Sequence, residues 1–567
     1  MQGLTFTHRP HHEPYKDGLH LRPHSVAALV GLIILKIICI TQKSCVPHAY
    51  LCRRIPQTDT IMKELQGKYC TDCKIFTDNV EEEAVELIQS LLDQRPFEGA
   101  HVRIMPDVHM GKGITIGFSA PLGKYVNPNH VGVDIGCTVS TMELDNVVPE
   151  ERYAEFESLV GAAIPTGFHI NESDVIDKND FFAFLNAEYK QVMNDFPEMV
   201  CPVDTIDETF IKKFLLRIGM DTNVCVKPKD PRELAHLGLA SKRTFKNDFV
   251  KPDEQISAMA RNFRASESRS QACLDYAERS RKSQSNRTDK NTFYRSLPSL
   301  GGGNHFLEYG ETDDGRGFFT AHCGSRNLGV KVCSYWLRKA NEHNRAVSAE
   351  ENQKIVEAVK ASCKDRTQWG RLIAEAVAKL REDSFIPGYL TGGYLKGYLS
   401  DMVITQAYAR YNHIMIHQKV KHILQEAFGI HTVNEIYTTH NYIDFKDHPM
   451  LRKGAIRAYK DELCIIPFNM RDGLAICRGK SNEDWNYTAP HGAGRILSRT
   501  AAKQQLKLED FQNSMKEVYS TTVCTGTIDE SPMAYKPMDE IVRLIEPTVD
   551  ILYFVRPKIN IKATDEE

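Results

Sequence analysis

Short apolar runs alternate with Gly, Pro and Asn between Arg103 and Val139, a pattern that predicts a sheet of short strands joined by tight turns. Elsewhere apolar residues recur every three or four positions, as they do on the buried face of a helix. Such a stripe predicts a helix from Asp78 to Gln94, with Asp78 as its amino-terminal cap and Pro96 beyond its end. The chain therefore combines predicted strands with predicted helices.

A longer helix is predicted from Leu399 to Leu424. Its apolar residues have the spacing of a buried stripe, and that stripe consists of Met402, Ala409, Ile416, Val420 and Ile423. The same helix carries three histidines, which are His413, His417 and His422. An isolated histidine on a helix is more often a surface or core residue than a metal ligand, so we expect no metal site here.

Two segments differ in polarity from the rest of the chain. Val26–Ile40 is apolar apart from Lys36, and a helix of that length spans about 22 Å, short of the roughly 30 Å of a bilayer core. We interpret residues 1–60 as an amino-terminal extension, whose apolar segment is an appendage, a buried helix, or a membrane or targeting segment. Residues 61–567 form the main domain in this interpretation. Residues 180–295 are polar and predict a solvated helical insertion.

Composition constrains the class of protein more than its activity. With 42% hydrophobic residues among 567, the chain can build a large core. The formal net charge of −3 gives no overall basic field, so any nucleic acid must bind a local patch. The 15 cysteines are scattered, which indicates free thiols in a reducing compartment, and we expect a cytoplasmic location. We interpret Cys70 and Cys73 as structural, because a zinc ribbon requires a second pair.

Metal-capable and phosphate-capable residues gather in five segments, the first four of which contain glycine. The segments are 105–113, 131–137, 301–308, 322–326 and 439–442. Asp134 and Cys137 can converge on one ion if the turn between them is tight, which Gly136 permits. Neutral imidazole is the commonest protein ligand for metals. The histidines in these segments that allow a close backbone approach are His305, His322 and His440. Each one alone is typical of a structural residue, but their combination predicts a metal site.

A different chemistry is indicated by His491, which is flanked by small residues and followed four positions later by Arg495. In this arrangement the ring can present a nitrogen to a phosphorus atom while the guanidinium holds the phosphate oxygens. Glycine-rich turns that contain histidine are also common at tight corners. The residues alone therefore leave a structural role for His491 open.

Seven motifs of this chain resemble those of the RtcB-type RNA-splicing ligases and occur in the same order. They are Met-Pro-Asp-Val-His, Gly-Val-Asp-Ile-Gly-Cys, Gly-Gly-Gly-Asn-His-Phe, His-Cys-Gly-Ser-Arg, His-Asn-Tyr, Arg-Lys-Gly-Ala and His-Gly-Ala-Gly-Arg. The resemblance extends from about Ile104 to the carboxyl end, apart from the polar stretch before Gly301. It implies an α/β fold of mixed sheets and helices, with a deep central cleft that binds metal.

The resemblance also implies roles for individual residues. Two Mn²⁺ ions would share Cys137, with Asp134 and His305 completing one site and His322 and His440 the other. His491 would be the nucleophile that becomes guanylylated. The residues implied to bind GTP are Asn304, His305, Phe306, Glu308, Asn469, Ala493, Arg495 and Lys562.

The implied activity joins an RNA 2′,3′-cyclic phosphate or 3′-phosphate to a 5′-hydroxyl end, using GTP and Mn²⁺, in tRNA splicing or RNA repair. The implied partners are GTP and RNA, either tRNA halves or broken RNA, and the need for an activating protein stays open. An arm that grips RNA is the alternative interpretation of residues 180–295. Apart from the apolar segment 26–40, we expect no stable membrane partner.

This chain departs from the family pattern around the nucleotide. Asn469 and Leu474 fall where serines are common, Pro490 replaces a serine before His491, and Thr138 replaces a glycine. Two alternatives to an active ligase therefore remain. One is a metal-dependent phosphoesterase or nucleotidyl transferase with an altered nucleotide pocket, and the other is an RNA-binding relative without turnover. One cysteine and three histidines also suit zinc, so spacing does not choose between zinc and manganese.

Overall fold

The computed structural model describes residues 62–220, 292–363, 365–384 and 388–564. All of them belong to one of the two units of the chain, Thr60–Glu567. The apolar run 26–40 lies outside the described residues, so the domain boundary after residue 60 stays a prediction. Within the described ranges, no helix combines the length and the apolar character that crossing a bilayer requires.

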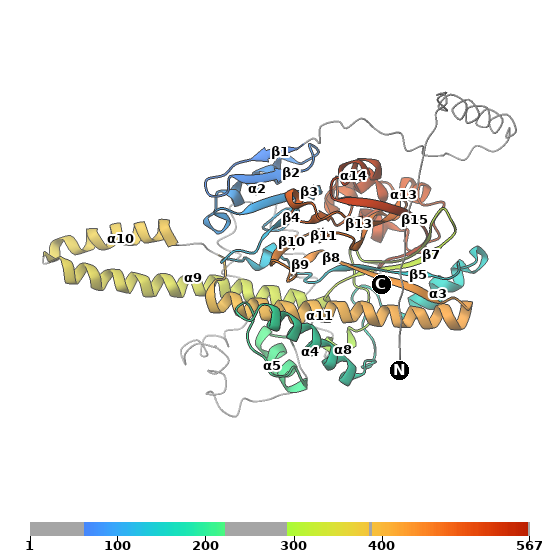
Figure 1. Ribbon diagram of the computed structural model, residues 1–567, viewed down its shortest axis with the longest axis horizontal. Helices are drawn as coiled ribbons and strands as arrows, with labels where there is room; N and C mark the ends of the chain where they lie inside the picture. The colour runs from blue at the N-terminus through green and yellow to red at the C-terminus, as the bar shows by residue number, and fades with distance from the viewer. Residues whose placement is uncertain (1–61, 221–291, 364, 385–387, 565–567) are drawn as a thin grey trace, which may run out of the picture. The chain divides into compact units, whose positions relative to one another are not determined.

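The largest sheet has seven strands, and every neighbouring pair is antiparallel. Their order is β12-β13-β15-β6-β7-β5-β8 (Figure 1). The bounds are β5 Thr138–Leu144, β6 Phe306–Glu311, β7 Gly317–Cys323, β8 Thr432–Thr439, β12 Leu463–Asn469, β13 Gly473–Gly479 and β15 Val549–Ile561. Nearly all residues of β5 and β7 are buried, because side chains pack against both faces of these central strands.

The second sheet has six strands in the order β1-β2-β3-β4-β10-β9, and only β2 and β3 pair in parallel. Its bounds are β1 Lys63–Leu65, β2 Asp72–Ile75, β3 His101–His109, β4 Ile116–Pro121, β9 Asn441–Asp444 and β10 Met450–Lys453. A short ribbon is formed by β11 Ala455–Arg457 and β14 Thr488–Pro490. The predicted short strands between Arg103 and Val139 are thus confirmed as β3, β4 and the start of β5.

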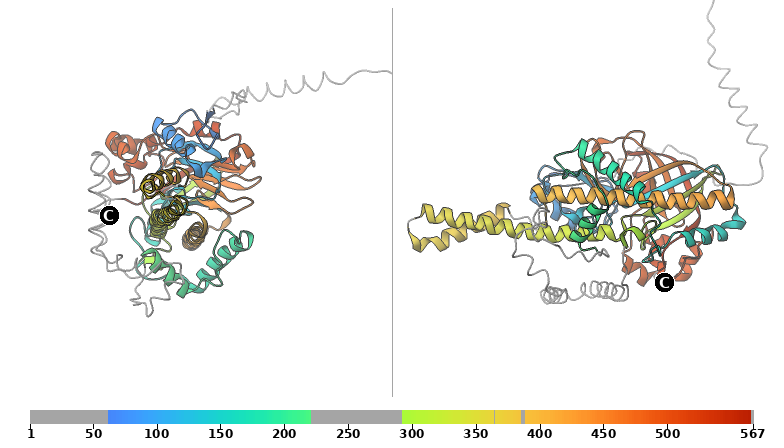
Figure 2. Two further views of the ribbon diagram at one scale, coloured as in Figure 1. Left: turned by 90° about the vertical axis from the view of Figure 1, so that its left-hand side faces the viewer. Right: turned by 90° about the horizontal axis from the view of Figure 1, so that it is seen from below.

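Eleven helices are described in these ranges, and α11 is the central one. Their bounds are α2 Glu82–Leu92, α3 Tyr153–Ala163, α4 Lys178–Asp195, α5 Glu208–Ile218, α8 Thr292–Arg295, α9 Arg326–Ser362, α10 Trp369–Ser384, α11 Gly392–Ile423, α12 Arg499–Gln505, α13 Leu508–Ser514 and α14 Met538–Leu544. α11 contacts β5 and β7 as well as α4 and α9, and α9 runs beside it (Figures 1 and 2). A helix covered on several sides carries apolar residues around most of its circumference.

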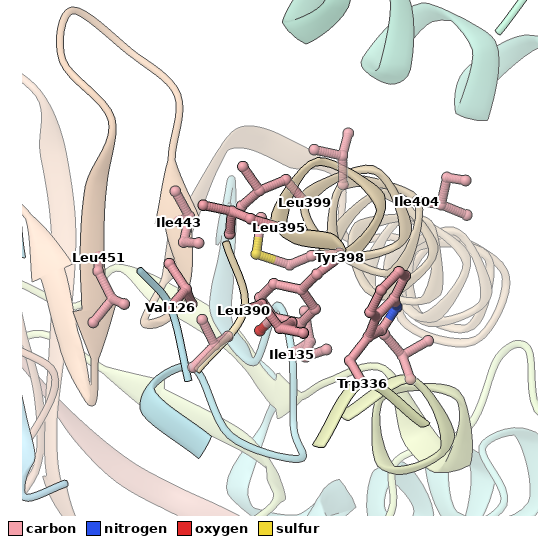
Figure 3. Packing of buried hydrophobic residues seen from close by; sticks show 14 of the residues in the cluster. Val126, Ile135, Trp336, Leu390, Leu395, Tyr398, Leu399, Ile404, Ile443 and Leu451 are labelled. Atoms are coloured by element: carbon pink, nitrogen blue, oxygen red, sulfur yellow. The ribbon is translucent and has the colours of Figure 1, made fainter. Parts of the chain in front are cut away.

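The largest apolar cluster joins α9 and α11 to the six-stranded sheet. Figure 3 shows Trp336 of α9 and Tyr398 of α11 among its members. The labelled residues that complete this packing are Val126, Ile135, Leu390, Leu395, Leu399, Ile404, Ile443 and Leu451. Ile135 lies between Asp134 and Cys137, so burial of this residue fixes the segment that carries two predicted metal ligands.

The predicted helix 399–424 is confirmed, but it begins earlier, at Gly392. The predicted stripe is buried at four positions and partly buried at Ile423. The helix predicted at 78–94 is α2, and Asp78 is not its cap. Glu81 occupies the cap position in an extended conformation, and no side chain bonds the first turn.

The stretch predicted as a solvated helical insertion at 180–295 is helical in its described first part, but one face of that part is buried. Phe181, Leu185 and Tyr189 of α4 are buried, and α4 packs on α11. The average composition of this stretch is polar, but it contains a narrow stripe of apolar residues, and such a stripe is sufficient to bury one face of a helix. Residues 221–291 lie outside the described residues. Cys70 and Cys73 are buried free thiols, as expected of structural cysteines.

Candidate functional site

The predicted metal ligands meet where the chain passes from one sheet to the other. β8 ends at Thr439 in the seven-stranded sheet and β9 begins at Asn441 in the six-stranded sheet, so His440 is the single residue between them. The segment between β4 and β5 makes a similar passage. The ligands contributed by that segment and by the ends of β6 and β7 are Asp134, Cys137, His305 and His322.

All five side chains converge on a small volume. The Sγ atom of Cys137 lies 3.3 Å from Nε2 of His322 and 3.5 Å from Nε2 of His305. Nε2 of His322 lies 3.4 Å from Nε2 of His440, and Nε2 of His305 lies 3.0 Å from Oδ2 of Asp134. Two groups of three potential ligands result, each with its ligand atoms within 4.8 Å of one another, and Cys137 belongs to both.

The charge states of these groups fit a cation. Burial, followed by the charges of neighbouring histidines, lowers the pKa of His322 and of His440 well below the ordinary value, so both rings are neutral. Burial, followed by the neighbouring carboxylate of Asp134, raises the pKa of the Cys137 thiol. Two neutral rings with their Nε2 atoms 3.4 Å apart can share one proton or, with both lone pairs directed between them, bind a cation. The second arrangement suits a divalent ion, whose charge would also favour the thiolate of Cys137.

The turn that brings Asp134 and Cys137 together has the predicted form. Gly136 has a φ of +73°, a conformation that a residue with a side chain adopts only at a cost. In this turn the Cys137 amide donates to the Asp134 carbonyl at 3.3 Å, and the His440 amide donates to the Cys137 carbonyl at 2.9 Å. The backbone therefore ties the two halves of the cluster to each other.

His491 follows β14 and lies beside the cluster, with its ring centroid 4.9 Å from that of His440. Its Nδ1 lies 2.6 Å from Oδ2 of the fully buried Asp107, and its backbone amide donates to the same oxygen at 3.0 Å. Gly494 permits this approach, because a Cβ there would lie 2.3 Å from the Asp107 carbonyl oxygen. With Nδ1 bonded to a carboxylate, Nε2 carries the free lone pair.

A cavity of about 450 Å³ opens beside His491 and His322. Seven of the eight residues implied to bind the nucleotide line it, and they are Asn304, Phe306, Glu308, Asn469, Ala493, Arg495 and Lys562. The eighth, His305, does not line the cavity, because its ring faces the metal cluster. One cavity thus connects the cluster, the histidine and the predicted nucleotide-binding residues.

Buried charges form the wall of this cavity. Lys562 Nζ lies 3.2 Å from Glu530 Oε2 and donates to the Asn304 carbonyl at 3.3 Å. Burial raises the pKa of Glu308 to about 8, although Asn560 donates a hydrogen bond to its carboxylate at 2.8 Å. Burial also acts to raise the pKa of Glu530, but nearby cations, led by Lys562, outweigh it and lower that pKa. The cavity therefore offers both a cation and a carboxyl group to a ligand.

Arg495 lines the cavity, yet its guanidinium contacts protein groups. It donates to the Leu497 carbonyl at 3.0 Å and to the Tyr535 hydroxyl at 3.2 Å, and it lies 3.3 Å from Glu530. Contact with phosphate oxygens, which we predicted for Arg495, would therefore require this guanidinium to share or exchange partners.

Sequence reasoning gave no role to Asp107, Glu530 or Asn560. The one indication for Asp107 was its position as a charged residue within a buried strand, because β3 is buried over residues 102–108. Asn469 accepts hydrogen bonds from the backbone amides of Arg471 and Asp472, so it closes its own hairpin turn. Leu474 is fully buried in an apolar cluster and does not line the cavity.

Comparison with known proteins agrees with this geometry. Residues 92–563 match the family described as tRNA-splicing ligase RtcB. The RNA-splicing ligase RtcB of Escherichia coli K12 is 25% identical over 504 residues, which cover 86% of this chain and 97% of that protein. The tRNA-splicing ligase RtcB of Archaeoglobus fulgidus is 24% identical over 297 residues, 44% of this chain and 55% of that protein. The chain belongs to the RtcB family of RNA ligases.

Proposed function

We propose that this protein is a GTP- and Mn²⁺-dependent RNA ligase, which joins a 3′-phosphate or 2′,3′-cyclic phosphate to a 5′-hydroxyl end through a guanylylated His491. The observation that supports this most is the position of His491. Its ring is bonded to Asp107 on one side, and it borders both the metal cluster and the cavity. That arrangement suits a nucleophile, because one ring nitrogen is fixed and the other is directed to substrate.

The five clustered side chains would hold two divalent ions, with Cys137 shared between them. When bound, such ions stabilise negative charge on phosphoryl oxygens. Our choice of manganese rests on the family, since the ligand set suits zinc as well.

In the proposed reaction, His491 Nε2 attacks the α-phosphorus of GTP. A nitrogen–phosphorus bond forms, the bond to the bridging oxygen breaks, and pyrophosphate leaves. GMP then passes to the RNA 3′-phosphate, which frees His491. The 5′-hydroxyl oxygen of the second RNA attacks the phosphorus of the RNA 3′-phosphate, the bond from that phosphorus to GMP breaks, GMP leaves, and the hydroxyl proton goes to solvent. A 2′,3′-cyclic phosphate first consumes one water to become a 3′-phosphate. Negative charge develops in each step, so nearby cations such as Lys562 favour it.

The buried Glu308 carboxyl supports the choice of guanine. Guanine presents two adjacent N–H donors on one edge, and a carboxylate accepts both. Burial raises the pKa of Glu308 to about 8. Hydrogen bonds from the two guanine donors would favour the ionised form of this carboxyl group.

Covalent labelling tests the proposal. The protein is incubated with Mn²⁺ and α-labelled GTP, and then with RNA fragments that carry 3′-phosphate and 5′-hydroxyl ends. We expect a protein-bound label that survives alkali but not acid, as a phosphoramidate does, followed by joined RNA. Because Asn469 closes its own turn, an altered nucleotide pocket is the second candidate. Metal-dependent phosphate release without any label would favour that phosphoesterase.

Asp107→Asn is expected to slow formation of the label by about a hundredfold, because the carboxylate stabilises the positive charge that the ring gains when Nε2 binds phosphorus. The rate of labelling at saturating GTP measures this effect. Metal content serves as the control and stays normal, since Asp107 is outside the cluster. Labelling at the wild-type rate would show that Asp107 only supports the fold.

The remaining partners and the location are part of the same proposal. All cysteines in the part of the chain that the structure describes are free, which supports a reducing, cytoplasmic setting. RNA is the expected substrate of a member of this family. Comparing multiple-turnover joining with and without cell extract tests whether an activating protein is required.

A further inference from the structure

A buried chain of hydrogen bonds connects α11 to the seven-stranded sheet. Ser140 Oγ lies 2.6 Å from Nδ1 of His413 and 2.8 Å from Nε2 of His417. Nδ1 of His417 lies 3.1 Å from Oε2 of Glu435, and Nε2 of His413 lies 3.1 Å from Sγ of Cys323. Ser140, both histidines and Cys323 are at most 1% exposed. Polar groups so deeply buried are retained only when they are paired.

The ring proton of His413 can be placed from its contacts. Burial lowers the pKa of His413 to about 3 and also lowers that of His417, so each ring is neutral and offers one donor and one acceptor. Nε2 of His413 lies 3.0 Å from the Cys323 carbonyl oxygen, which can only accept, so Nε2–H donates to it. Nδ1 of His413 therefore accepts from the Ser140 hydroxyl. Ser140 also contacts the His417 ring, whose other nitrogen faces Glu435, and polar groups linked in this way strengthen one another's hydrogen bonds.

The strands connected by these hydrogen bonds are also the ones that carry or adjoin the metal ligands. Ser140 is on β5, which follows Cys137 directly, and Cys323 comes immediately after His322 at the end of β7. Glu435 is on β8, which ends one residue before His440. These strands are hydrogen-bonded neighbours in the order β7-β5-β8.

The two sets of residues lie on opposite faces of the sheet. Side chains alternate between faces along a strand, so the odd number of positions from Cys137 to Ser140 and from His322 to Cys323 places each pair on different faces. On the Ser140 face lies α11, which provides both histidines of the hydrogen-bond chain. Helix α11 thus packs on the face of the sheet opposite the metal cluster.

We propose that Ser140, His413 and His417 are positioning residues of the metal centre. They hold β5, β7 and β8 at the mutual spacing at which Cys137, His322 and His440 share ions. The proposal rests on the proposed metal site. Removing the Ser140 hydroxyl would leave two ring nitrogens unpaired in the core and allow the strands to shift. Both the affinity for metal and the stability of the fold would therefore decrease.

The test measures Mn²⁺ binding by the full chain, by titration calorimetry with Mn²⁺ alone, and unfolding of the same proteins in excess chelator. Ser140→Ala is expected to weaken Mn²⁺ binding by about tenfold or more. Tyr437→Phe is a milder second variant that keeps the proposal testable if Ser140→Ala does not fold. The Tyr437 hydroxyl donates to Glu435 at 2.6 Å, and we expect a smaller loss in the same direction.

Tyr408→Phe is the matched control. This residue is on α11, and its buried hydroxyl donates to the Phe293 carbonyl at 2.7 Å, outside the chain of bonds. It should lower the unfolding temperature without changing Mn²⁺ affinity by more than about twofold. The inference is overturned if Ser140→Ala and Tyr437→Phe bind Mn²⁺ as the wild type does, or if Tyr408→Phe weakens binding equally. A wild-type protein that binds neither Mn²⁺ nor Zn²⁺ would instead remove the proposed metal site itself.

Discussion

His491→Ala is expected to abolish covalent labelling by α-labelled GTP and to reduce RNA joining by at least about a thousandfold, because no other group can accept the guanylyl unit once the nucleophile is removed. Metal content should remain near that of the wild type, since His491 belongs to neither group of potential ligands. Gel detection of the label and elemental analysis of the same preparation measure both quantities.

The control for this variant is His448→Ala, which removes an exposed histidine outside the cavity. It should label and join RNA normally. Retention of an alkali-stable label in His491→Ala would assign the nucleophile to another residue. Loss of metal from that variant would instead make His491 a ligand.

Cys137→Ala is expected to remove both the metal and the label. Its sulfur belongs to both groups of potential ligands, so its loss leaves each proposed ion with two protein ligands instead of three and removes the thiolate charge between them. We expect metal content close to background and no detectable adduct. Elemental analysis after dialysis and the same labelling assay provide the measurements.

Cys333→Ala is the matched control for this result. Cys333 is also a fully buried free thiol, but it lies on α9 and belongs to neither metal group. It should keep its metal and its label even if it lowers the unfolding temperature. Normal labelling by Cys137→Ala would contradict the assignment of a shared sulfur ligand.

The sequence was sufficient to predict which side chains form the cluster, because each of the five lies in a short motif that resembles one of the family's motifs. It did not predict what holds His491. Asp107 and His491 are 384 positions apart in the chain, and nothing in either motif indicates their contact. The partners of Arg495 were missed for the same reason, since Glu530 comes from a distant segment.

Local periodicity predicted helices well where the apolar stripe was wide and poorly where it was narrow. α11 was predicted because its apolar residues recur over many turns. In α4, three buried aromatic and aliphatic side chains are surrounded by polar residues, so average polarity suggested a solvated segment. Only the tertiary contact with α11 shows that this face is buried.

The single residue between β8 and β9 has a mechanical consequence. With only His440 joining strands of two different sheets, a hinge motion between those sheets would pull its imidazole away from Cys137 and His322. An ion bound by His440 together with Cys137 and His322 would oppose such opening. In the proposed reaction, release of pyrophosphate and GMP would then depend on movement of the segments that surround the cavity, while the sheets themselves stay closed.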